Sequence, residues 1–424
     1  MRISNAGERR LGPQEALFAE LTRRGNGAIQ LVCMAEFEKR PDPDAVRSAL
    51  QRIHRRHPML QARIEDREVP WWVCDVPFEG IDIRVEAAPG GLDVETFYAA
   101  EAARPIDVTA ATWRAVVAID AEGKASWITI VSNHGAVDGR SALVVLNDLD
   151  VLLNDSDAWS DAVLPLPVAA EEGLATSGLS GDRGLLPAWP AETQWQVDRP
   201  AGSSERRPQA FLRVVPQATV DALHDTLRPH GIHLGAAFAA AAVRAGEVLP
   251  GRTAWTGIVA PTDVRGDCTP AVPGNVVGEY VAGIALMLGP GQIGASLLET
   301  ARELQEQFRR NRPPSLLMEA HVPPETTRGQ VDAMAAASPV FAGGICVSDI
   351  GDANRLSGRR LGFSRLLVMP SQNHGIHPVM VAIVTTSEGA CLSFGYDAPL
   401  RTAADAHAFA GRYLQALDAL AAGG

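Results

Sequence analysis

The sequence is poor in cysteine and almost free of lysine, and it contains no long apolar run. Its five cysteines lie far apart and are odd in number, so they supply neither the Cys-x-x-Cys spacing of a metal site nor a disulfide framework. Three of them, Cys33, Cys346 and Cys391, lie in apolar segments, where a buried reduced thiol is expected. No stretch of about 18 apolar residues occurs, and the N-terminal residues lack the apolar core of a signal peptide. We therefore expect a cytoplasmic protein with no membrane span.

The charge balance argues against a nucleic-acid partner. Lys and Arg total 38 residues against 50 Asp and Glu, which gives a net charge of −12, and only Lys39 and Lys124 are lysines. The Arg-Arg pairs are scattered along the chain rather than clustered. Because binding to a phosphate backbone needs clustered positive charge, we expect no nucleic-acid partner.

Length and composition predict two domains. A chain of 424 residues is too long for one simple core and suggests two units of roughly 200 residues each. The hydrophobic fraction of 46% and the charged fraction of 21% are typical of globular proteins. Residues 166–208 are rich in Pro, Gly, Ser and Glu, which is typical of a linker or crossover. The predicted division is therefore an N-terminal domain of residues 1–165 and a C-terminal domain of residues 209–424.

The most informative segment is residues 132–139, Ser-Asn-His-Gly-Ala-Val-Asp-Gly. The β-branched run at 127–131 predicts a buried strand before it, and leucines at helical spacing over 141–153 predict a helix after it. His134 and Asp138 therefore lie on a strand-to-helix turn. A histidine there can reach into a cleft as a general base, because its ordinary pKa is close to physiological pH. By itself the spacing also fits a loop histidine followed by an aspartate that caps the helix.

This segment resembles the HHxxxDG motif of the chloramphenicol acetyltransferase-like superfamily, which includes peptide-synthetase condensation domains, polyketide-associated acyltransferases and plant BAHD acyltransferases. Asn133 stands in place of the first histidine, and His134, Asp138 and Gly139 match the rest of the motif. Further segments resemble superfamily motifs in the same order along the chain: Arg-Arg-His-Pro at 55–58, Arg-Pro-Ile-Asp at 104–107, Thr-Asp-Val-Arg at 262–265, Gly-Asn-Val-Val-Gly at 274–278, Ser-Asp-Ile-Gly at 348–351 and Phe-Gly-Tyr-Asp at 394–397. Together they cover nearly the whole chain.

The resemblance implies a mixed α/β (α+β) fold of two chloramphenicol acetyltransferase-like α/β sandwich subdomains, arranged as a V with the active-site tunnel between them. It implies that His134 is the catalytic base and that Asp138 pairs with Arg265, which would tie one subdomain to the other. Asn133 and Gly139 would support the loop. The residues alone are also compatible with Asp138 as a simple helix cap and Arg265 as a solvated loop residue.

Two further segments are candidates for the substrate channel. Ser348 could donate a hydrogen bond near the oxyanion of acyl transfer, and its segment also fits a structural turn. His374 and His377 form a His-x-x-His pair that, together with His134 and Asp138, suggests a metal-dependent hydrolase as an alternative. A zinc site needs three protein ligands held by supporting contacts, so we interpret the pair as a turn or channel wall and expect no metal.

The resulting prediction is a stand-alone acyltransferase of specialised metabolism that transfers an acyl group from a thioester to a hydroxyl or amine acceptor. The donor would be acyl-coenzyme A or an acyl carrier protein, and the acceptor a small molecule. We expect a monomer with no cofactor beyond the thioester substrate. A condensation-fold protein that binds or cyclises a substrate without intermolecular transfer is the alternative.

Overall fold

The first subdomain is built on a five-stranded sheet. The computed structural model describes residues 7–179, 193–251, 254–294, 296–316, 319 and 321–423. The sheet has the order β12-β2-β7-β6-β5, in which β5 and β6 are parallel and the other neighbours are antiparallel. Its strands are β2 (Gln30–Phe37), β5 (Ile83–Ala87), β6 (Trp113–Ile119), β7 (Ala125–Asn133) and β12 (Phe363–Pro370).

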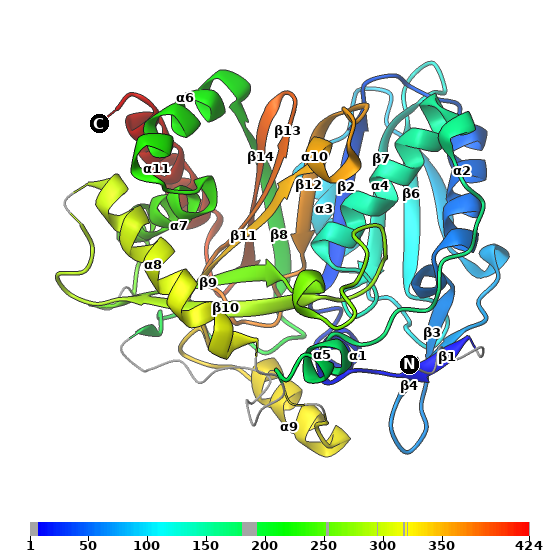
Figure 1. The fold of residues 1–424 in the computed structure, drawn as a ribbon, viewed down its shortest axis with the longest axis horizontal. Coiled ribbons are helices and arrows are strands. Elements are labelled where there is room, and N and C mark those ends of the chain that lie inside the picture. Colours follow the sequence, from blue (N-terminus) through cyan, green and yellow to red (C-terminus); the bar gives the residue numbers. More distant parts are fainter. Residues whose placement is uncertain are drawn as a thin grey trace.

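Strand β7 lies at the centre of this sheet, and all of its residues are buried. Its β-branched and aromatic side chains suit a strand covered on both faces, and the strand predicted over 127–131 is confirmed. The helix predicted over 141–153 is confirmed as α4 (Gly139–Asn154), which buries Leu143, Leu146 and Leu149. Helix α4 packs against α2 (Pro43–Arg56) beside the sheet (Figure 1).

The remaining N-terminal elements connect this subdomain to the rest of the molecule. Helix α3 (Val94–Ala102) contacts β2 of this sheet and also β8 (Arg207–Pro216), which belongs to a second large sheet. Helix α1 (Pro13–Arg24) contacts α9 (Pro324–Ala335). A small sheet has the order β1-β4-β3 and consists of β1 (Glu8–Arg10), β3 (Ala62–Glu65) and β4 (Trp71–Cys74). Helix α1 therefore lies where the two halves of the chain meet (Figure 1).

The second subdomain is built on a six-stranded sheet with the order β10-β9-β11-β13-β14-β8. Strand β11 is parallel to β9 and β13, and the other neighbours are antiparallel. Its strands are β8 (Arg207–Pro216), β9 (Thr256–Asp263), β10 (Val281–Leu288), β11 (Ile345–Asp352), β13 (Met380–Thr386) and β14 (Gly389–Ala398). Two extensive apolar clusters fill the molecule. One lies on the first sheet and also includes residues of the second sheet, such as Ala382 and Cys391, and the other lies on the second sheet.

Four helices cover the side of the second sheet that faces away from the first (Figure 1). They are α6 (Gln217–Leu227), α7 (Leu234–Ala245), α8 (Leu297–Ser315) and α11 (Ala403–Ala421). Helix α7 packs against both α8 and α11, and its many buried alanines allow a close approach. The short helix α10 (Ala353–Ser357) follows β11 and contacts α4 of the first subdomain.

The two subdomains exchange structure, so the expected division at residue 209 does not describe the whole C-terminal part. Strand β8 begins the second sheet at Arg207, close to that boundary. Strand β12, however, leaves the C-terminal half and pairs with β2 in the first sheet. The physical reason is that Leu366, Leu367 and Val368 of β12 are buried in the first apolar cluster, where they also satisfy the open edge of β2.

The segment expected as a linker, residues 166–208, contains an ordered helix. Helix α5 (Ala170–Thr176) packs so closely against the loop of residues 264–280 that a Cβ at Gly173 would lie 2.8 Å from Sγ of Cys268. The amide of Thr269 donates a hydrogen bond of 3.0 Å to the Gly173 carbonyl. The described part of this segment is therefore a packed element, and residues 180–192 lie outside the described residues.

All five cysteines are free, and Cys33, Cys346 and Cys391 are buried as predicted. Burial raises the pKa of Cys33 to about 12, so this thiol stays protonated at neutral pH. None of the helices in the described ranges is long and apolar enough to cross a membrane.

The crossover strand β12 should contribute strongly to stability. We expect Leu367→Ala to lower the free energy of unfolding by about 2–5 kcal/mol, because it empties a fully buried position in the first apolar cluster. Denaturant unfolding followed by circular dichroism measures the change. Leu356→Ala, at a partly exposed position on α10, is the matched control, and similar losses for the two variants would contradict a buried role for β12.

Candidate active site

His134 lies in the turn of residues 134–138, between the central strand β7 and helix α4. Its Nδ1 is 2.9 Å from Oε2 of Glu279, and the Phe18 ring meets the imidazole edge-on with 4.9 Å between ring centroids. Only 12% of the side chain is exposed. Nε2 has no hydrogen-bond partner among the described residues, so this nitrogen is the one available to a reacting group.

Glu279 reaches His134 from the second subdomain. It lies at the end of the loop that joins β9 to β10, and its carboxylate is buried. Its Oε1 accepts hydrogen bonds from Nε2 of Gln14, at 2.7 Å, and from the amide of Val281, at 3.2 Å. The surroundings of His134 are therefore assembled from helix α1 and from elements of both subdomains.

The charge of Glu279 makes the His134 imidazole more basic. Burial by itself would lower the pKa of His134, but the charge and the hydrogen bond of Glu279, with a smaller effect from Asp138, raise this pKa above its ordinary value. Burial raises the pKa of Glu279, while His134 and the Gln14 amide favour its ionised form. The arrangement suits an imidazole that accepts a proton during a reaction.

Asp138 and Arg265 form the ion pair that the resemblance implies. Arg265 Nη1 lies 2.9 Å from Oδ2 of Asp138, and Nη2 donates to Oδ1 at 3.1 Å. Burial would raise the pKa of Asp138, but the adjacent guanidinium outweighs it and holds the pKa below its usual range. Asp138 also caps α4, because its Oδ1 accepts from the Ser141 amide at 2.7 Å. The capping role and the pairing role therefore occur together.

The same contacts clamp the β9–β10 loop onto the start of α4. The amide of Tyr280 donates to Oδ2 of Asp138 at 3.0 Å, and the amide of Asp138 donates to the Gly278 carbonyl at 3.2 Å. The Ser141 hydroxyl donates to that carbonyl at 2.9 Å, and the Arg265 guanidinium lies 4.7 Å from the centre of the Tyr280 ring. These bonds hold Glu279, between Gly278 and Tyr280, in place beside His134.

Asn133 and Gly139 shape the two ends of the turn. The side-chain amide of Asn133 donates to the Thr22 hydroxyl at 3.0 Å, and its oxygen accepts from the Gly135 amide at 3.0 Å. Gly139 approaches the second subdomain so closely that a Cβ there would lie 3.2 Å from Cδ1 of Ile350. Both residues therefore contact the structure around the loop rather than the reactive face of His134.

The overall fold matches solved structures along almost the whole chain. The condensation domain of the Monacolin K polyketide synthase MokA superposes with a TM-score of 0.70 at 11% identity, covering 98% of this chain and 97% of that chain. TRI3 trichothecene 15-O-acetyltransferase from Fusarium sporotrichioides has a TM-score of 0.69 at 13% identity, covering 97% and 95% of the two chains. The chain therefore shares the fold of these structures over almost its whole length.

A third match comes from a protein associated with a polyketide synthase. Polyketide synthase associated protein 5 from Mycobacterium tuberculosis has a TM-score of 0.66 at 15% identity, covering 97% of this chain and 96% of that chain. No family model and no curated protein match the sequence. The condensation-domain fold is thus shared at low identity, and the chemistry of this chain has to be argued from its own residues.

Two candidates from the sequence, Ser348 and His374, make no hydrogen bond, ion pair or ring contact with His134 among the described residues. Ser348 lies on β11, paired with Ala382 on β13. His374 is buried in the loop between β12 and β13, where its Nδ1 accepts the Ile376 amide at 3.0 Å, and its ring meets His377 edge-on. Burial, with smaller effects from His377 and Arg206, holds the pKa of His374 well below its ordinary value, so this histidine is neutral.

The histidine pair that suggested a metal hydrolase is committed to other contacts. Nδ1 of His377 lies 2.8 Å from the Gly344 carbonyl, and burial lowers the pKa of His377 to about 4. Within the described ranges, no group of three or more His, Cys, Asp or Glu side chains is placed to hold a metal ion. The contacts indicate that the two histidines shape this loop.

Sequence reasoning missed Glu279 and Gln14. Glu279 directly follows the Gly-Asn-Val-Val-Gly segment, so a carboxylate beside a recognised motif was a usable signal. The sequence around Gln14 carried no such signal, because the role of Gln14 depends on how α1 packs against the β9–β10 loop. Both residues are far from His134 in the sequence and reach its site only in the folded chain.

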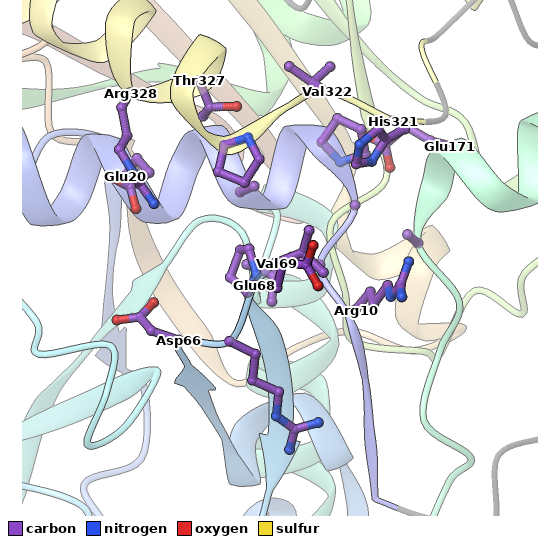
Figure 2. A pocket seen from close by; sticks show the side chains of 18 of the residues that line it. Arg10, Glu20, Asp66, Glu68, Val69, Glu171, His321, Val322, Thr327 and Arg328 are labelled. Atoms are coloured by element: carbon purple, nitrogen blue, oxygen red, sulfur yellow. The ribbon is translucent and has the colours of Figure 1, made fainter.

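A cavity of about 950 Å³ lies beside α1 (Figure 2). At 3.6 residues per turn, Pro13, Ala16 and Glu20 line it from the side of α1 opposite Gln14 and Phe18, which face the His134 site. The hairpin between β3 and β4 and the residues before α9 form other walls, as the labelled Asp66 and His321 show. His134 does not line this cavity, so the tunnel between the subdomains stays a prediction.

The Asp138–Arg265 pair should stabilise the protein as well as the loop. We expect Arg265→Ala to lower the free energy of unfolding by about 3–5 kcal/mol, because it leaves the Asp138 carboxylate buried without its partner. Asp138→Asn should act in the same direction. Thermal unfolding of both variants beside the wild type measures this loss.

An exposed pair supplies the control for this prediction. Arg360 pairs with Glu38 at 2.8 Å, and about half of its side chain is exposed, so Arg360→Ala should cost about 1 kcal/mol or less. Equal thermal midpoints for the wild type, Arg265→Ala and Asp138→Asn would contradict the stabilising role of the buried pair.

Proposed function

We propose that this protein is an acyltransferase that moves an acyl group from a thioester to a hydroxyl or amine acceptor, with His134 as the general base. The observation that carries the proposal is the orientation of the His134 ring. Its Nδ1 contacts the buried carboxylate of Glu279, and its Nε2 has no hydrogen-bond partner among the described residues. A ring held in this way is suited to take a proton from an acceptor. The match to an enzyme named as an O-acetyltransferase supports the acceptor chemistry.

The reaction can be written in terms of the His134 imidazole. Nε2 takes the proton from the acceptor hydroxyl or amine as its oxygen or nitrogen attacks the thioester carbonyl. The tetrahedral intermediate then collapses, the carbon–sulfur bond breaks, and the imidazolium returns the proton to the leaving thiolate. No covalent acyl-enzyme forms, and much of the acceleration would come from alignment of donor and acceptor, which can supply on the order of 7–11 kcal/mol.

The ion pair of Asp138 with Arg265 lies outside the line of this reaction. Its part is to hold the turn and the β9–β10 loop together, because every oxygen of Asp138 is engaged by donors other than His134. The donor is acyl-coenzyme A or an acyl carrier protein, and no further cofactor is required because the thioester is already activated. The proposal therefore covers both the thioester donor and the hydroxyl or amine acceptor.

Thiol release tests the proposal directly. Wild type and His134→Ala would be incubated with a panel of acyl-coenzyme A thioesters and acyl-loaded carrier proteins, together with mixed alcohol and amine acceptors. We expect release that requires both an acceptor and His134, because His134→Ala removes the base but no core side chain. His224→Ala, which changes an exposed histidine on α6, should retain full activity.

The outcomes separate the two candidate functions. Near wild-type turnover by His134→Ala would rule out the general-base role. If folded wild-type protein releases thiol from none of the donors, the protein binds or cyclises a substrate without intermolecular transfer.

The pH dependence of transfer should reflect the basicity of His134. A general base works in its neutral form, so the rate falls when the pH drops below the pKa of the folded-state imidazole. Because Glu279 raises the pKa of His134, the acid limb of kcat/KM should lie above about pH 6.5, the ordinary value for histidine. A profile of kcat/KM for the donor against pH, at saturating acceptor, measures the position of this acid limb. An acid limb at lower pH than the ordinary histidine value would count against His134 as the base.

A further inference from the structure

We propose that Glu279 is a positioning residue for His134, which fixes the imidazole in the tautomer that carries its hydrogen on Nδ1 and leaves Nε2 as the base. This inference deepens the proposed function and rests on it for its catalytic meaning. The tautomer itself can be measured without any substrate. Glu279 would act through His134 and would not touch the reacting atoms.

The Glu279 carboxylate is held so that it cannot turn away from the ring. Its side chain is only 1% exposed. Oε1 is occupied by the Gln14 side-chain amide at 2.7 Å and the Val281 amide at 3.2 Å, which leaves Oε2 facing Nδ1 at 2.9 Å. The edge-on contact with Phe18 restricts rotation of the ring from another side.

Hydrogen-bond chemistry then selects the tautomer. An ionised carboxylate has no hydrogen to donate, so the Nδ1 that faces it must carry the hydrogen. The lone pair of the neutral ring is consequently on Nε2, the nitrogen that has no partner among the described residues. When Nε2 accepts a proton, the adjacent carboxylate also stabilises the resulting imidazolium.

Asp138 does not supply this contact, although it belongs to the recognised motif. Its two oxygens are taken by the Arg265 guanidinium and by the backbone amides of Ser141 and Tyr280. Asp138 therefore affects the His134 ring only through its charge. The orienting partner comes instead from the β9–β10 loop, in the other subdomain.

Gln14 extends the arrangement by one further step. Its side chain holds Oε1 of Glu279 and also donates to the Val281 carbonyl at 2.7 Å. Its backbone amide donates to Oε1 of Glu171 at 2.8 Å, which fixes the start of α1. The orientation of the carboxylate is thus set by the position of α1 against the loop.

The substitution Glu279→Gln gives a specific expectation. The amide oxygen of the new side chain should stay with the Gln14 and Val281 donors, which places the amide nitrogen against Nδ1. That nitrogen can only donate, so the His134 ring should switch to the tautomer with hydrogen on Nε2 and lose its base. We expect kcat/KM to fall on the order of 100- to 10,000-fold.

Nitrogen-15 NMR of histidine-labelled protein reads the tautomer directly. Above the pKa of His134 the wild type should show hydrogen on Nδ1, and Glu279→Gln should show it on Nε2. Removal of the carboxylate should also shift the acid limb of the pH–rate profile to lower pH. A wild-type spectrum with hydrogen on Nε2 would overturn the proposal on its own, whether or not the variant folds.

A second buried histidine–carboxylate contact provides the matched control. Nε2 of His57 lies 2.7 Å from Oδ2 of Asp148, away from the His134 turn. Asp148→Asn removes another buried carboxylate that contacts a histidine and should lower stability, while the His134 tautomer and the acid limb stay as in the wild type. Equal changes at His134 in Asp148→Asn and Glu279→Gln would show a general structural effect and refute the positioning role.

A double variant tests the direction of the hydrogen bonds. In Gln14→Glu/Glu279→Gln, the new carboxylate at position 14 can accept from the amide nitrogen at position 279. That contact turns the amide oxygen toward Nδ1 and gives up the hydrogen bonds with the amide and the carbonyl of Val281. We expect the Nδ1–H tautomer and part of the activity to return. Hydrogen remaining on Nε2 in this variant would contradict the assigned geometry.

These measurements separate the inference from the proposed function. Absence of thiol release together with an Nδ1–H tautomer in the wild type would refute acyl transfer but leave the orienting contact in place. Thiol release that depends on His134 and is unaffected by Glu279→Gln would retain acyl transfer and refute the role of Glu279.

Discussion

The buried ion pair between Asp138 and Arg265 is the constraint on which the arrangement around His134 depends. A charged pair taken out of water is costly unless its remaining hydrogen-bonding groups are satisfied. Here both partners make several further hydrogen bonds, and Nε of Arg265 is the guanidinium nitrogen that makes none. Asp138 receives backbone amides from both subdomains, and Arg265 also contacts Asp263 and the Ser141 hydroxyl. The turn cannot move relative to the β9–β10 loop without leaving one of these charges unpaired.

Two exchanges between the subdomains reinforce that constraint. The β9–β10 loop carries residues of the second subdomain to the start of α4, and β12 runs the other way to complete the first sheet. His134 directly follows the central strand β7 and lies where the β9–β10 loop meets the first subdomain. A base at this junction can be supported by side chains that a single subdomain could not bring together.

A buried carboxylate contacts the base, and a second carboxyl group lies behind it. Glu279 contacts the ring, and Glu171 lies one step further along, bonded to the backbone of Gln14. Burial, with a smaller contribution from the charge of Glu15, raises the pKa of Glu171 to about 7, so this carboxyl is only partly ionised at neutral pH. The charge and the hydrogen bond of Glu279, with a smaller effect from Asp138, explain why the pKa of His134 rises although the side chain is largely buried.

The local structure and the two residues of the buried pair could be predicted from the sequence. The apolar run before His134 and the leucine spacing after Asp138 were sufficient for β7 and α4, because both patterns are set by short-range periodicity. The resemblance along the chain was sufficient to pair Asp138 with Arg265 and to place Asn133 and Gly139 in support of the loop.

The side chain that faces Nδ1 of His134 could be identified only from the three-dimensional structure, because Glu279 and Gln14 lie far from His134 in sequence and meet through long-range packing. The crossing of β12 and the packing of α5 have the same origin, since strand pairing and helix contacts between distant segments leave no periodic signal in either segment. Contacts of this kind depend on how two cores fit together, which no single stretch of the chain encodes.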